Sequence, residues 1–187
     1  MFEDYYPKEK PSRFALRELF DWVEAGMVAV ACVVLVFTFA VRLAGVDGDS
    51  MNPTLYNRDR LLITRLFYTP QQGDIVVVTK PTHRNEPLIK RVIATGGQTV
   101  DIDFVSHTVI VDGVVLDEEH YIAEPTAQQY DLSFPQTVPE GCVFIMGDNR
   151  NHSWDSRDSE VGMVDERYIL GKVIYRVLPY RSMGVPR

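Results

Sequence analysis

Apolar residues are arranged in two ways along the chain. One long run, residues 25–41, contains no charged side chain, and apolar neighbours extend it on both sides. Its length is at the lower edge of what a membrane-spanning helix needs, so we predict a single transmembrane α-helix over residues 25–44, with Glu24 and Arg42 near the two interfaces. A cleaved secretory signal and a buried core helix are the alternatives, although the run is long for the apolar part of a secretory signal and a polar segment precedes it.

From residue 45 onward, the apolar positions form short runs of the kind that make β-strands. The runs lie at 59–68, 73–80, 88–95, 107–117, 140–148 and 170–180. Asp112 and Gly113 suit a tight hairpin turn, and a helical signal is confined to one turn near residues 165–168. We therefore predict a mainly β fold with an antiparallel β-barrel-like domain, closed or partly closed, in which the polar segment 119–141 is a long surface connection.

The composition excludes several classes of function. A chain of 187 residues is long enough for one domain and a short anchor, and its net charge of −7, without clustered Lys and Arg, argues against nucleic-acid binding. Cys32 lies in the long apolar run and Cys142 lies far from it, so we predict no disulfide. The histidines show no metal-ligand spacing, and we predict neither a metal ion nor a cofactor.

The basic residues on either side of the long apolar run do not orient it. Equal numbers lie near each end: Lys8, Lys10, Arg13 and Arg17 before it, and Arg42, Arg58, Arg60 and Arg65 after it. The positive-inside rule therefore gives no topology, and the location of the remaining chain has to be inferred from its motifs.

A serine follows the apolar run closely, in "GDSMNPTL" at residues 48–55. A free hydroxyl is a poor nucleophile, and a catalytic Ser50 needs a neighbouring group that takes its proton. His152, which lies close to Asp155 in the sequence, could form a Ser–His–Asp arrangement. The other possible partner is a lysine. The lysines from residue 45 onward are Lys80, Lys90 and Lys172.

Lys90 is the lysine whose neighbours suit a general base. In "PLIKRVIA" it shares one face of a predicted strand with Leu88 and Val92, while Ile89 and Arg91 lie on the other face. If the Leu88 and Val92 face is buried, the amine lies among apolar side chains. Burial disfavours the ammonium form, lowers the lysine pKa and makes a neutral amine available as a base. The alternative is that Lys90 faces solvent.

A third candidate segment is "MGDNRNHSWDSR" at residues 146–157. Its Gly-Asp-Asn sequence is typical of turns. Ser153 could form a hydrogen bond with a neutral lysine amine and orient it, while Asp155 and Arg157 could pair and brace the loop. The alternative is a polar surface loop without a catalytic role.

Three of these segments, in this order after an N-terminal apolar run, resemble the bacterial type I signal peptidases: "GDSMNPTL", "LIKRVI" and "GDNRNHSWDSR". The segment "GDIVVV" at 73–78 and the closing "VGMVDERYILGKVIYRVLP" at 161–179 are also similar to that family. The resemblance covers residues 46–179, and the motifs taken together and in order are very specific.

The resemblance implies a membrane-bound Ser–Lys endopeptidase. Such an enzyme removes signal peptides from secreted preproteins after small residues, at Ala-X-Ala sites, on the outer face of the cytoplasmic membrane. Residues 1–24 would then be cytoplasmic, residues 25–44 would span the membrane once, and residues 45–187 would form an extracytoplasmic peptidase domain. The implied partners are signal peptides and the lipid bilayer, with no nucleic acid and no metal.

The resemblance also implies a role for each motif residue. Ser50 would be the nucleophile and Lys90 the general base. Ser153 would hold the Lys90 amine, and Asp155 and Arg157 would support the loop as an ion pair. The substrate would lie as an added strand between the segment before Ser50 and the strand that carries Lys90. The residues expected around the oxyanion and the substrate are Gly48, Asp49, Met51, Val46, Leu88 and Ile89.

The sequence departs from the family pattern in two places. Some members carry a serine two residues before the nucleophile, whereas this chain has Gly48, so we expect the backbone N–H of Ser50 to stabilise the oxyanion. The segment "ATGGQ" at 94–98 replaces the Gly-Leu-Pro-Gly-Asp-like turn that is usual in the family. Two other functions stay open: a specialised Ser–Lys processing protease of pilin or conjugation type, and a membrane-anchored binding module that has lost catalysis.

Overall fold

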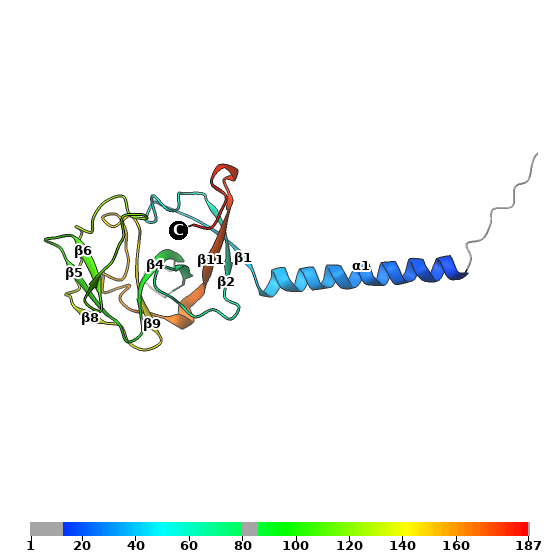
Figure 1. The fold of residues 1–187 in the computed structure, drawn as a ribbon, viewed down its shortest axis with the longest axis horizontal. Helices are drawn as coiled ribbons and strands as arrows, with labels where there is room; N and C mark the ends of the chain where they lie inside the picture. The colour runs from blue at the N-terminus through cyan, green and yellow to red at the C-terminus, as the bar shows by residue number, and fades with distance from the viewer. Residues whose placement is uncertain (1–12, 80–85, 187) are drawn as a thin grey trace, which may run out of the picture. The chain divides into compact units, whose positions relative to one another are not determined.

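The computed structural model describes residues 13–79 and 86–186 (Figure 1). Lys80, His83 and the first part of the predicted segment 1–24 lie outside the described residues. The chain divides into two units, Met1–Phe39 and Ala40–Arg187, which are described separately. The second unit is called the β domain below.

The first unit contains one helix, α1 (Arg13–Phe39). Its segment Leu16–Thr38 comprises 23 residues with a mean hydropathy of 2.1, and none of it is buried within the protein. This length and composition are sufficient to cross a bilayer. The helix ends before the predicted bound of 44, because Arg42–Gly45 forms strand β1 and pairs with another strand of the β domain. Hydropathy could not show that the helix ends before these residues, since Leu43 and Ala44 are as apolar as the helix.

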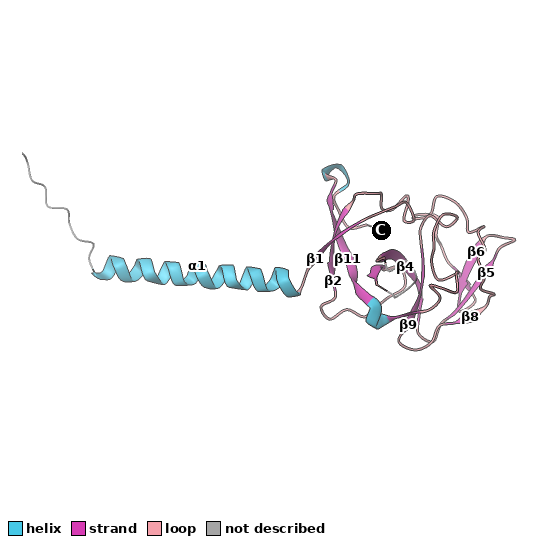
Figure 2. Cartoon of the chain, turned by 180° about the vertical axis from the view of Figure 1, so that it is seen from behind, coloured by secondary structure: helices cyan, strands magenta, loops and turns pink. Residues whose placement is uncertain are grey.

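The β domain is built on a seven-stranded antiparallel sheet, with the order β1-β2-β11-β3-β4-β9-β10. The strands of the domain are coloured magenta in Figure 2. The strands are β1 (Arg42–Gly45), β2 (Arg60–Thr64), β3 (Ile75–Val78), β4 (Leu88–Thr95), β9 (Cys142–Met146), β10 (Val164–Asp165) and β11 (Ile169–Leu178). In the described part of the chain β1 and β10 do not pair with each other, so the sheet is a curled, open half-barrel. The predicted mainly β, partly closed fold behind an N-terminal helix is confirmed.

A second, four-stranded sheet has the order β7-β6-β5-β8. Its strands are β5 (Thr99–Asp103), β6 (Thr108–Val111), β7 (Val114–Val115) and β8 (Gln136–Thr137). The predicted hairpin turn joins β6 to β7, and both Asp112 and Gly113 have the positive φ that a tight turn of this kind requires (51° and 79°). The strands β5 and β8 were not predicted, and β8 lies within the segment expected to be a surface connection.

Two short 3₁₀ helices complete the domain, η1 (Glu166–Tyr168) and η2 (Tyr180–Ser182). The first is the helical turn predicted near residues 165–168. The side chain of Asp165 caps it by accepting a hydrogen bond from the backbone N–H of Arg167 at 2.8 Å.

Three apolar clusters form the core, and β4 contributes to all of them. Val92 packs in a cluster with Ile145 and Val164, Ile93 packs with Phe144 between the two sheets, and Ile89 packs against a third cluster below β1 and β2. Because β4 has both faces covered along its central residues, any side chain at its middle is held inside the protein.

Candidate active site

Ser50 lies in a tight turn that the core holds in place. Gly48 adopts a φ of 86°, a conformation that residues with a Cβ seldom adopt, and Asn52 N–H donates to the Asp49 carbonyl at 3.1 Å. The side chains of Met51 and Leu55 are buried in the cluster below β1 and β2. The turn therefore presents the Ser50 hydroxyl in a fixed position beside the sheet.

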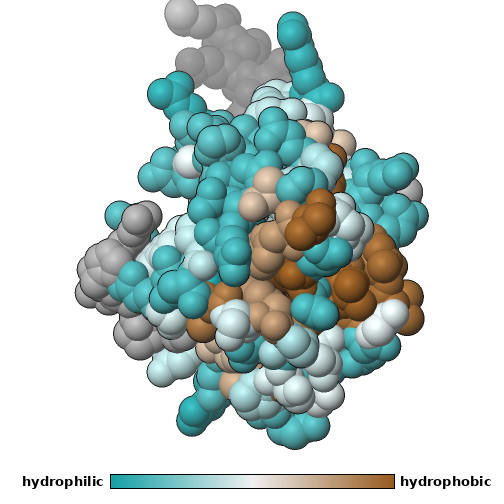
Figure 3. Space-filling view, turned by 90° about the vertical axis from the view of Figure 1, so that its left-hand side faces the viewer, coloured by the Kyte–Doolittle hydropathy of each residue, from teal (hydrophilic) through white to brown (hydrophobic). Residues whose placement is uncertain are grey.

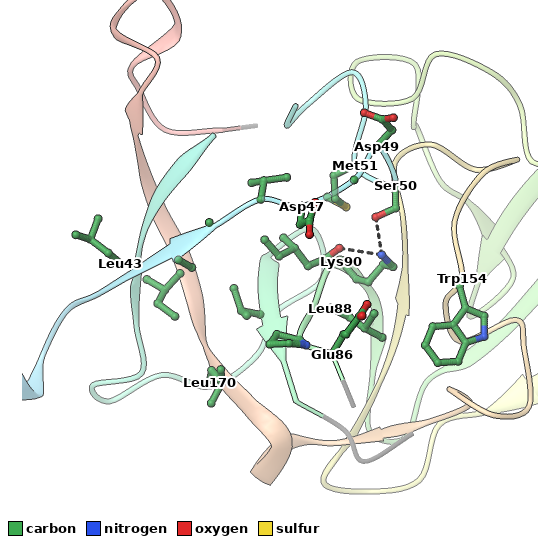
Figure 4. Close-up of a pocket in the computed structure, with 18 of the residues that line it drawn as sticks. Leu43, Asp47, Asp49, Ser50, Met51, Glu86, Leu88, Lys90, Trp154 and Leu170 are labelled. Carbon is green, nitrogen blue, oxygen red and sulfur yellow. Dashed lines mark hydrogen bonds between the residues drawn. The ribbon is translucent and has the colours of Figure 1, made fainter. Parts of the chain in front are cut away.

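Lys90 reaches Ser50 from the middle of β4 (Figure 4). Its Nζ lies 2.7 Å from Ser50 Oγ and 3.1 Å from the Ile89 carbonyl oxygen. The residue is only 2% exposed, so the solvent-facing alternative is wrong. Burial lowers the pKa of Lys90 to about 8, although the nearby carboxylates of Asp155 and Asp148 oppose this effect by favouring the ammonium form.

The hydroxyl of Ser153 is buried nearby without a hydrogen-bond partner among the described residues. Burial raises the pKa of the Asp155 carboxyl, but Arg157 lowers it by more, and the Ser153 hydroxyl makes a smaller contribution to this lowering, so the Ser153 and Asp155 side chains lie close together. Ser153 also packs so tightly on Gly147 that a side chain at Gly147 would overlap its Oγ and the carbonyl oxygen of Ser50. The structure thus brings Ser153 against the Ser50 turn, but it does not contain the predicted hydrogen bond to Lys90.

Asp155 and Arg157 form the expected ion pair inside the loop between β9 and β10. Arg157 Nε donates to Asp155 Oδ1 and Arg157 Nη2 donates to Asp155 Oδ2, both at 2.8 Å. The backbone N–H of Gly147 also donates to Asp155 Oδ2, at 3.0 Å. Both carboxylate oxygens are therefore occupied, and Asp155 is not oriented toward the exposed His152. This arrangement argues against a Ser–His–Asp triad.

Two further buried ion pairs hold the same loop, and sequence reasoning missed them. Asp148 accepts two hydrogen bonds from Arg91, at 2.8 and 2.7 Å, and therefore ties the loop to the residue that follows Lys90. Glu118 accepts two from Arg150, at 2.7 and 2.6 Å. Each pair joins segments far apart in the chain, and no local pattern of residues pairs these charges.

Asn149 connects the loop between β9 and β10 to the Ser50 turn through hydrogen bonds. The sequence did not predict this connection. Its backbone N–H donates to the Ser50 carbonyl and its side-chain amide donates to the Asp49 carbonyl, both at 3.0 Å. Thr54, four residues after Ser50, donates to Asp148 at 2.5 Å. The turn that carries the nucleophile and the loop that carries Ser153 are therefore one hydrogen-bonded assembly.

A cleft of about 770 Å³ opens in front of Ser50 and Lys90. The residues predicted around the oxyanion and the substrate all line it: Val46, Gly48, Asp49, Met51, Leu88 and Ile89. Residues that sequence reasoning missed also line it, among them Glu86, Trp154 and Leu170. On one side β4 pairs with β3 along Leu88–Lys90, but on the other side its pairing with β9 begins only at Arg91. The backbone of residues 88–90 therefore has one edge without a strand partner in the described part of the chain.

Comparison with known proteins assigns the family. The family described as signal peptidase, peptidase S26, matches residues 19–178. This chain belongs to the S26 signal peptidase family. A probable signal peptidase I-1 of Synechocystis sp. is 39% identical over 84% of this chain and 82% of the relative. The signal peptidase I of Bacillus licheniformis is 32% identical over 94% of this chain and 97% of the relative.

A solved structure is also similar to this S26 family member. The crystal structure of a signal peptidase I from Enterococcus faecalis V583 shares 31% sequence identity with it and has a TM-score of 0.45. The similarity covers 56% of this chain and 97% of the solved one.

Near Ser50, the cleft of this S26 family member offers a backbone N–H group and no hydroxyl from position 48. Gly48 offers no hydroxyl, and nothing lies within 4 Å of where its Cβ would be. The backbone N–H of Ser50 donates to no other group among the described residues. It is therefore available to an oxygen atom bound in the cleft.

Proposed function

We propose that this protein is a membrane-bound serine endopeptidase that removes N-terminal signal peptides from secreted preproteins, with Ser50 as nucleophile and Lys90 as general base. The observation that carries the proposal is the 2.7 Å approach of Lys90 Nζ to Ser50 Oγ at a lysine that is almost completely buried. A buried amine with a pKa of about 8 is neutral in a usable fraction of molecules near neutral pH.

In the proposed reaction, neutral Lys90 accepts the Ser50 proton while Ser50 Oγ attacks the scissile carbonyl. The backbone N–H of Ser50 stabilises the resulting oxyanion. Lys90, now an ammonium, donates its proton to the leaving amine, and the C–N bond breaks to leave an acyl-enzyme. Water then gives a proton to Lys90 and attacks the ester carbonyl. Lys90 returns this proton to Ser50 Oγ as the ester bond breaks, which releases the signal peptide with a new carboxylate and regenerates Ser50.

Ser153 is proposed to complete the orientation of Lys90. A neutral amine that accepts the Ser50 proton through its lone pair has two N–H groups left. One can donate to the Ile89 carbonyl, at 3.1 Å, and the other needs an acceptor. The buried Ser153 Oγ lacks a partner among the described residues, and hydrogen bonds at catalytic sites often tighten only when substrate binds.

The proposed substrate is an extended peptide added to the open edge of β4 at residues 88–90, because main-chain groups there can pair with a strand of substrate. Side chains of Val46, Leu88 and Ile89 line the cleft beside that edge. Bulky aliphatic walls next to a strand leave shallow pockets, which favour small residues such as those of an Ala-X-Ala site.

α1 is proposed to be the single membrane anchor, with the β domain on the extracytoplasmic side and the segment before α1 in the cytoplasm. Ser50 follows Thr38, the last residue of the candidate span, by roughly 12 residues, and so lies within about 40 Å of the bilayer. Anchoring of enzyme and preprotein in one membrane raises their effective concentration for each other.

The experiment that tests the proposed function is cleavage of a preprotein with an Ala-X-Ala site by the detergent-solubilised full chain, with mass spectrometry locating the cut. We expect the wild type to cut after the second Ala, and the folded Ser50→Ala and Lys90→Ala variants to leave the preprotein intact. Absence of cleavage by folded wild type would instead favour a pilin-type processing substrate or a binding module.

A further inference from the structure

The Ser50 N–H can stabilise an oxyanion only if the peptide group that carries it is held in the right orientation. A peptide group is planar and trans, so the carbonyl of Asp49 and the N–H of Ser50 point in opposite directions within one plane. Gly48 supplies no hydroxyl to this part of the cleft. The groups that hold the Asp49 carbonyl therefore also set the direction of the N–H on which the proposed oxyanion depends.

Two donors hold the Asp49 carbonyl. The side-chain amide of Asn149 donates to it at 3.0 Å, and the backbone N–H of Asn52 donates to it at 3.1 Å. The backbone N–H of Asn149 donates to the next carbonyl along the chain, that of Ser50, also at 3.0 Å. Asn149 thus holds two consecutive carbonyls, one on each side of the Cα atom of the proposed nucleophile.

The position of Asn149 is fixed by neighbours that are anchored elsewhere in the domain. Asp148 is fully buried and accepts two hydrogen bonds from Arg91, at 2.8 and 2.7 Å. Arg150 is only 1% exposed and donates two hydrogen bonds to Glu118, at 2.7 and 2.6 Å. Asn149 itself is only partly buried. The loop is therefore held by the ion pairs on either side of Asn149, and its integrity does not depend on the Asn149 amide.

The hydrogen bond from Asn149 also strengthens the Ser50 N–H as a donor. A donor on a peptide carbonyl polarises the amide group, and successive hydrogen bonds along such a chain reinforce one another. The bond from Asn149 enters the peptide at the Asp49 oxygen, and the bond to an oxyanion leaves it at the Ser50 nitrogen. Because full negative charge develops on the substrate oxygen only during the attack, this reinforcement is larger in the transition state than in the bound substrate.

We propose that Asn149 positions and polarises the peptide group between Asp49 and Ser50, so that the Ser50 N–H is directed at the oxyanion and donates strongly to it. The inference rests on the proposed function, in which Ser50 attacks a peptide carbonyl. Asn149 is not among the described residues that line the cleft, and none of its hydrogen bonds there reaches Lys90. It is therefore a positioning residue that acts through the backbone of Ser50.

The test compares two variants of Asn149 in the detergent-solubilised full chain. Asn149→Leu keeps the approximate shape of the side chain and removes its donor, whereas Asn149→Ala removes the donor and leaves room for water. Both variants keep the backbone N–H that holds the Ser50 carbonyl.

Three measurements separate oxyanion stabilisation from substrate binding. Cleavage of a soluble peptide with an Ala-X-Ala site gives kcat and KM. A peptide aldehyde of the same sequence, which forms a tetrahedral adduct with the Ser50 hydroxyl, gives the affinity for an oxyanion. The same peptide with its scissile amide reduced to an amine cannot be cleaved, and its inhibition constant gives the affinity for a bound substrate.

We expect kcat to fall roughly tenfold in Asn149→Ala, the equivalent of one hydrogen bond, and further in Asn149→Leu, where water cannot replace the amide. The peptide aldehyde should lose affinity by a similar factor, while KM and the affinity of the reduced peptide stay within about twofold of the wild type. The midpoint of the pH profile should not move, because Asn149 does not act on Lys90.

Two control variants show whether a loosened loop or surface has the same effect. Asn151 lies in the same loop, and the hydrogen bonds of its side chain go to residues 124–128 and not to the Ser50 turn. The turn between β5 and β6, on the side of the domain that Figure 3 views, carries Val105, which is 91% exposed. Asn151→Ala and Val105→Ser should keep the wild-type kcat and aldehyde affinity, and chemical unfolding gives the stability of every variant.

Wild-type kcat and aldehyde affinity in folded Asn149→Leu would overturn the inference and leave the mechanism through Ser50 and Lys90 in place. Equal losses of affinity for the aldehyde and the reduced peptide, or an equal loss of kcat in Asn151→Ala, would limit Asn149 to holding the loop and would also overturn the inference. A wild-type protein that neither cleaves the peptide nor forms an adduct with the aldehyde would overturn the proposed function, and the inference with it.

Discussion

Raising the pH through the pKa of Lys90 is expected to activate the peptidase. Burial lowers that pKa from 10.5 to about 8, which corresponds to about 3 kcal/mol of preference for the neutral amine. With a pKa of about 8, roughly one molecule in ten carries neutral Lys90 at pH 7 and roughly nine in ten at pH 9. If neutral Lys90 is the base, kcat/KM should rise about tenfold per pH unit at acidic pH and level off above pH 8.

The assay is kcat/KM for an internally quenched peptide with an Ala-X-Ala site, measured on the detergent-solubilised full chain from pH 5 to 10. Circular dichroism at each pH shows that the protein stays folded, so that lost activity reports titration and not unfolding. A rise centred near pH 6.5 would indicate a histidine base and would refute the assignment of Lys90 as the base. A rate independent of pH between 6 and 8 would refute it equally.

Three further changes have expected outcomes. Lys90→Met should abolish cleavage yet stabilise the fold by up to about 3 kcal/mol at pH 7, measured by chemical unfolding in detergent. Because the folded pKa of Lys90 lies below its unfolded value, wild-type stability rises from pH 8 to 10.5, and the advantage of Lys90→Met should shrink over that window; a constant or absent gain would contradict the burial cost. Ser153→Ala should lower kcat roughly tenfold, the equivalent of one hydrogen bond, and alter the midpoint of the pH profile, whereas an unchanged profile would limit Ser153 to packing. Deleting residues 1–39, which leaves β1 intact, should spare cleavage of a soluble peptide and sharply reduce cleavage of a membrane-embedded preprotein; equal loss on both substrates would argue against tethering.

The strand that carries the proposed base was predictable, because "LIKRVIAT" combines β-branched residues with a clear end at Gly96 and Gly97. The burial of this strand could be predicted only in part. Alternation separates the two faces of a strand, but both faces of β4 are covered, one by the cluster around Val92 and the other by the clusters around Ile89 and Ile93. That coverage depends on packing against residues far away in the sequence, and the pattern of the eight strand residues does not show it.

The end of the transmembrane segment was not predictable for a related reason. Val41, Leu43 and Ala44 continue the apolar run, and hydropathy alone extends the helix through them. In the structure Leu43 and Ala44 pair with Leu62 and Leu61 of β2, and this pairing with a distant segment makes them a strand. Tertiary context thus overrides local composition at the boundary of the anchor.

The ion pairs of the loop between β9 and β10 differ in whether the sequence could predict them. Asp155 and Arg157 are two positions apart, so their pairing could be proposed from the sequence. Arg150 pairs with Glu118, which lies just before the segment that was expected to be only a surface connection. Arg150 also donates a hydrogen bond to Thr126, which lies within that segment. The segment 119–141 therefore helps to hold the loop that packs against Ser50, although nothing in its composition indicates this.

Trapping of the acyl-enzyme would show whether Ser50 becomes acylated with neutral Lys90 as the base. The full-length protein would be mixed with a peptide ester carrying an Ala-X-Ala acyl group, quenched in acid, digested and mapped by mass spectrometry. We predict an acyl adduct on Ser50 in the wild type, none in Ser50→Ala, and strongly slowed formation in Lys90→Ala that has been shown to be folded. An adduct on another residue, or undiminished acylation of Ser50 in Lys90→Ala, would contradict the account.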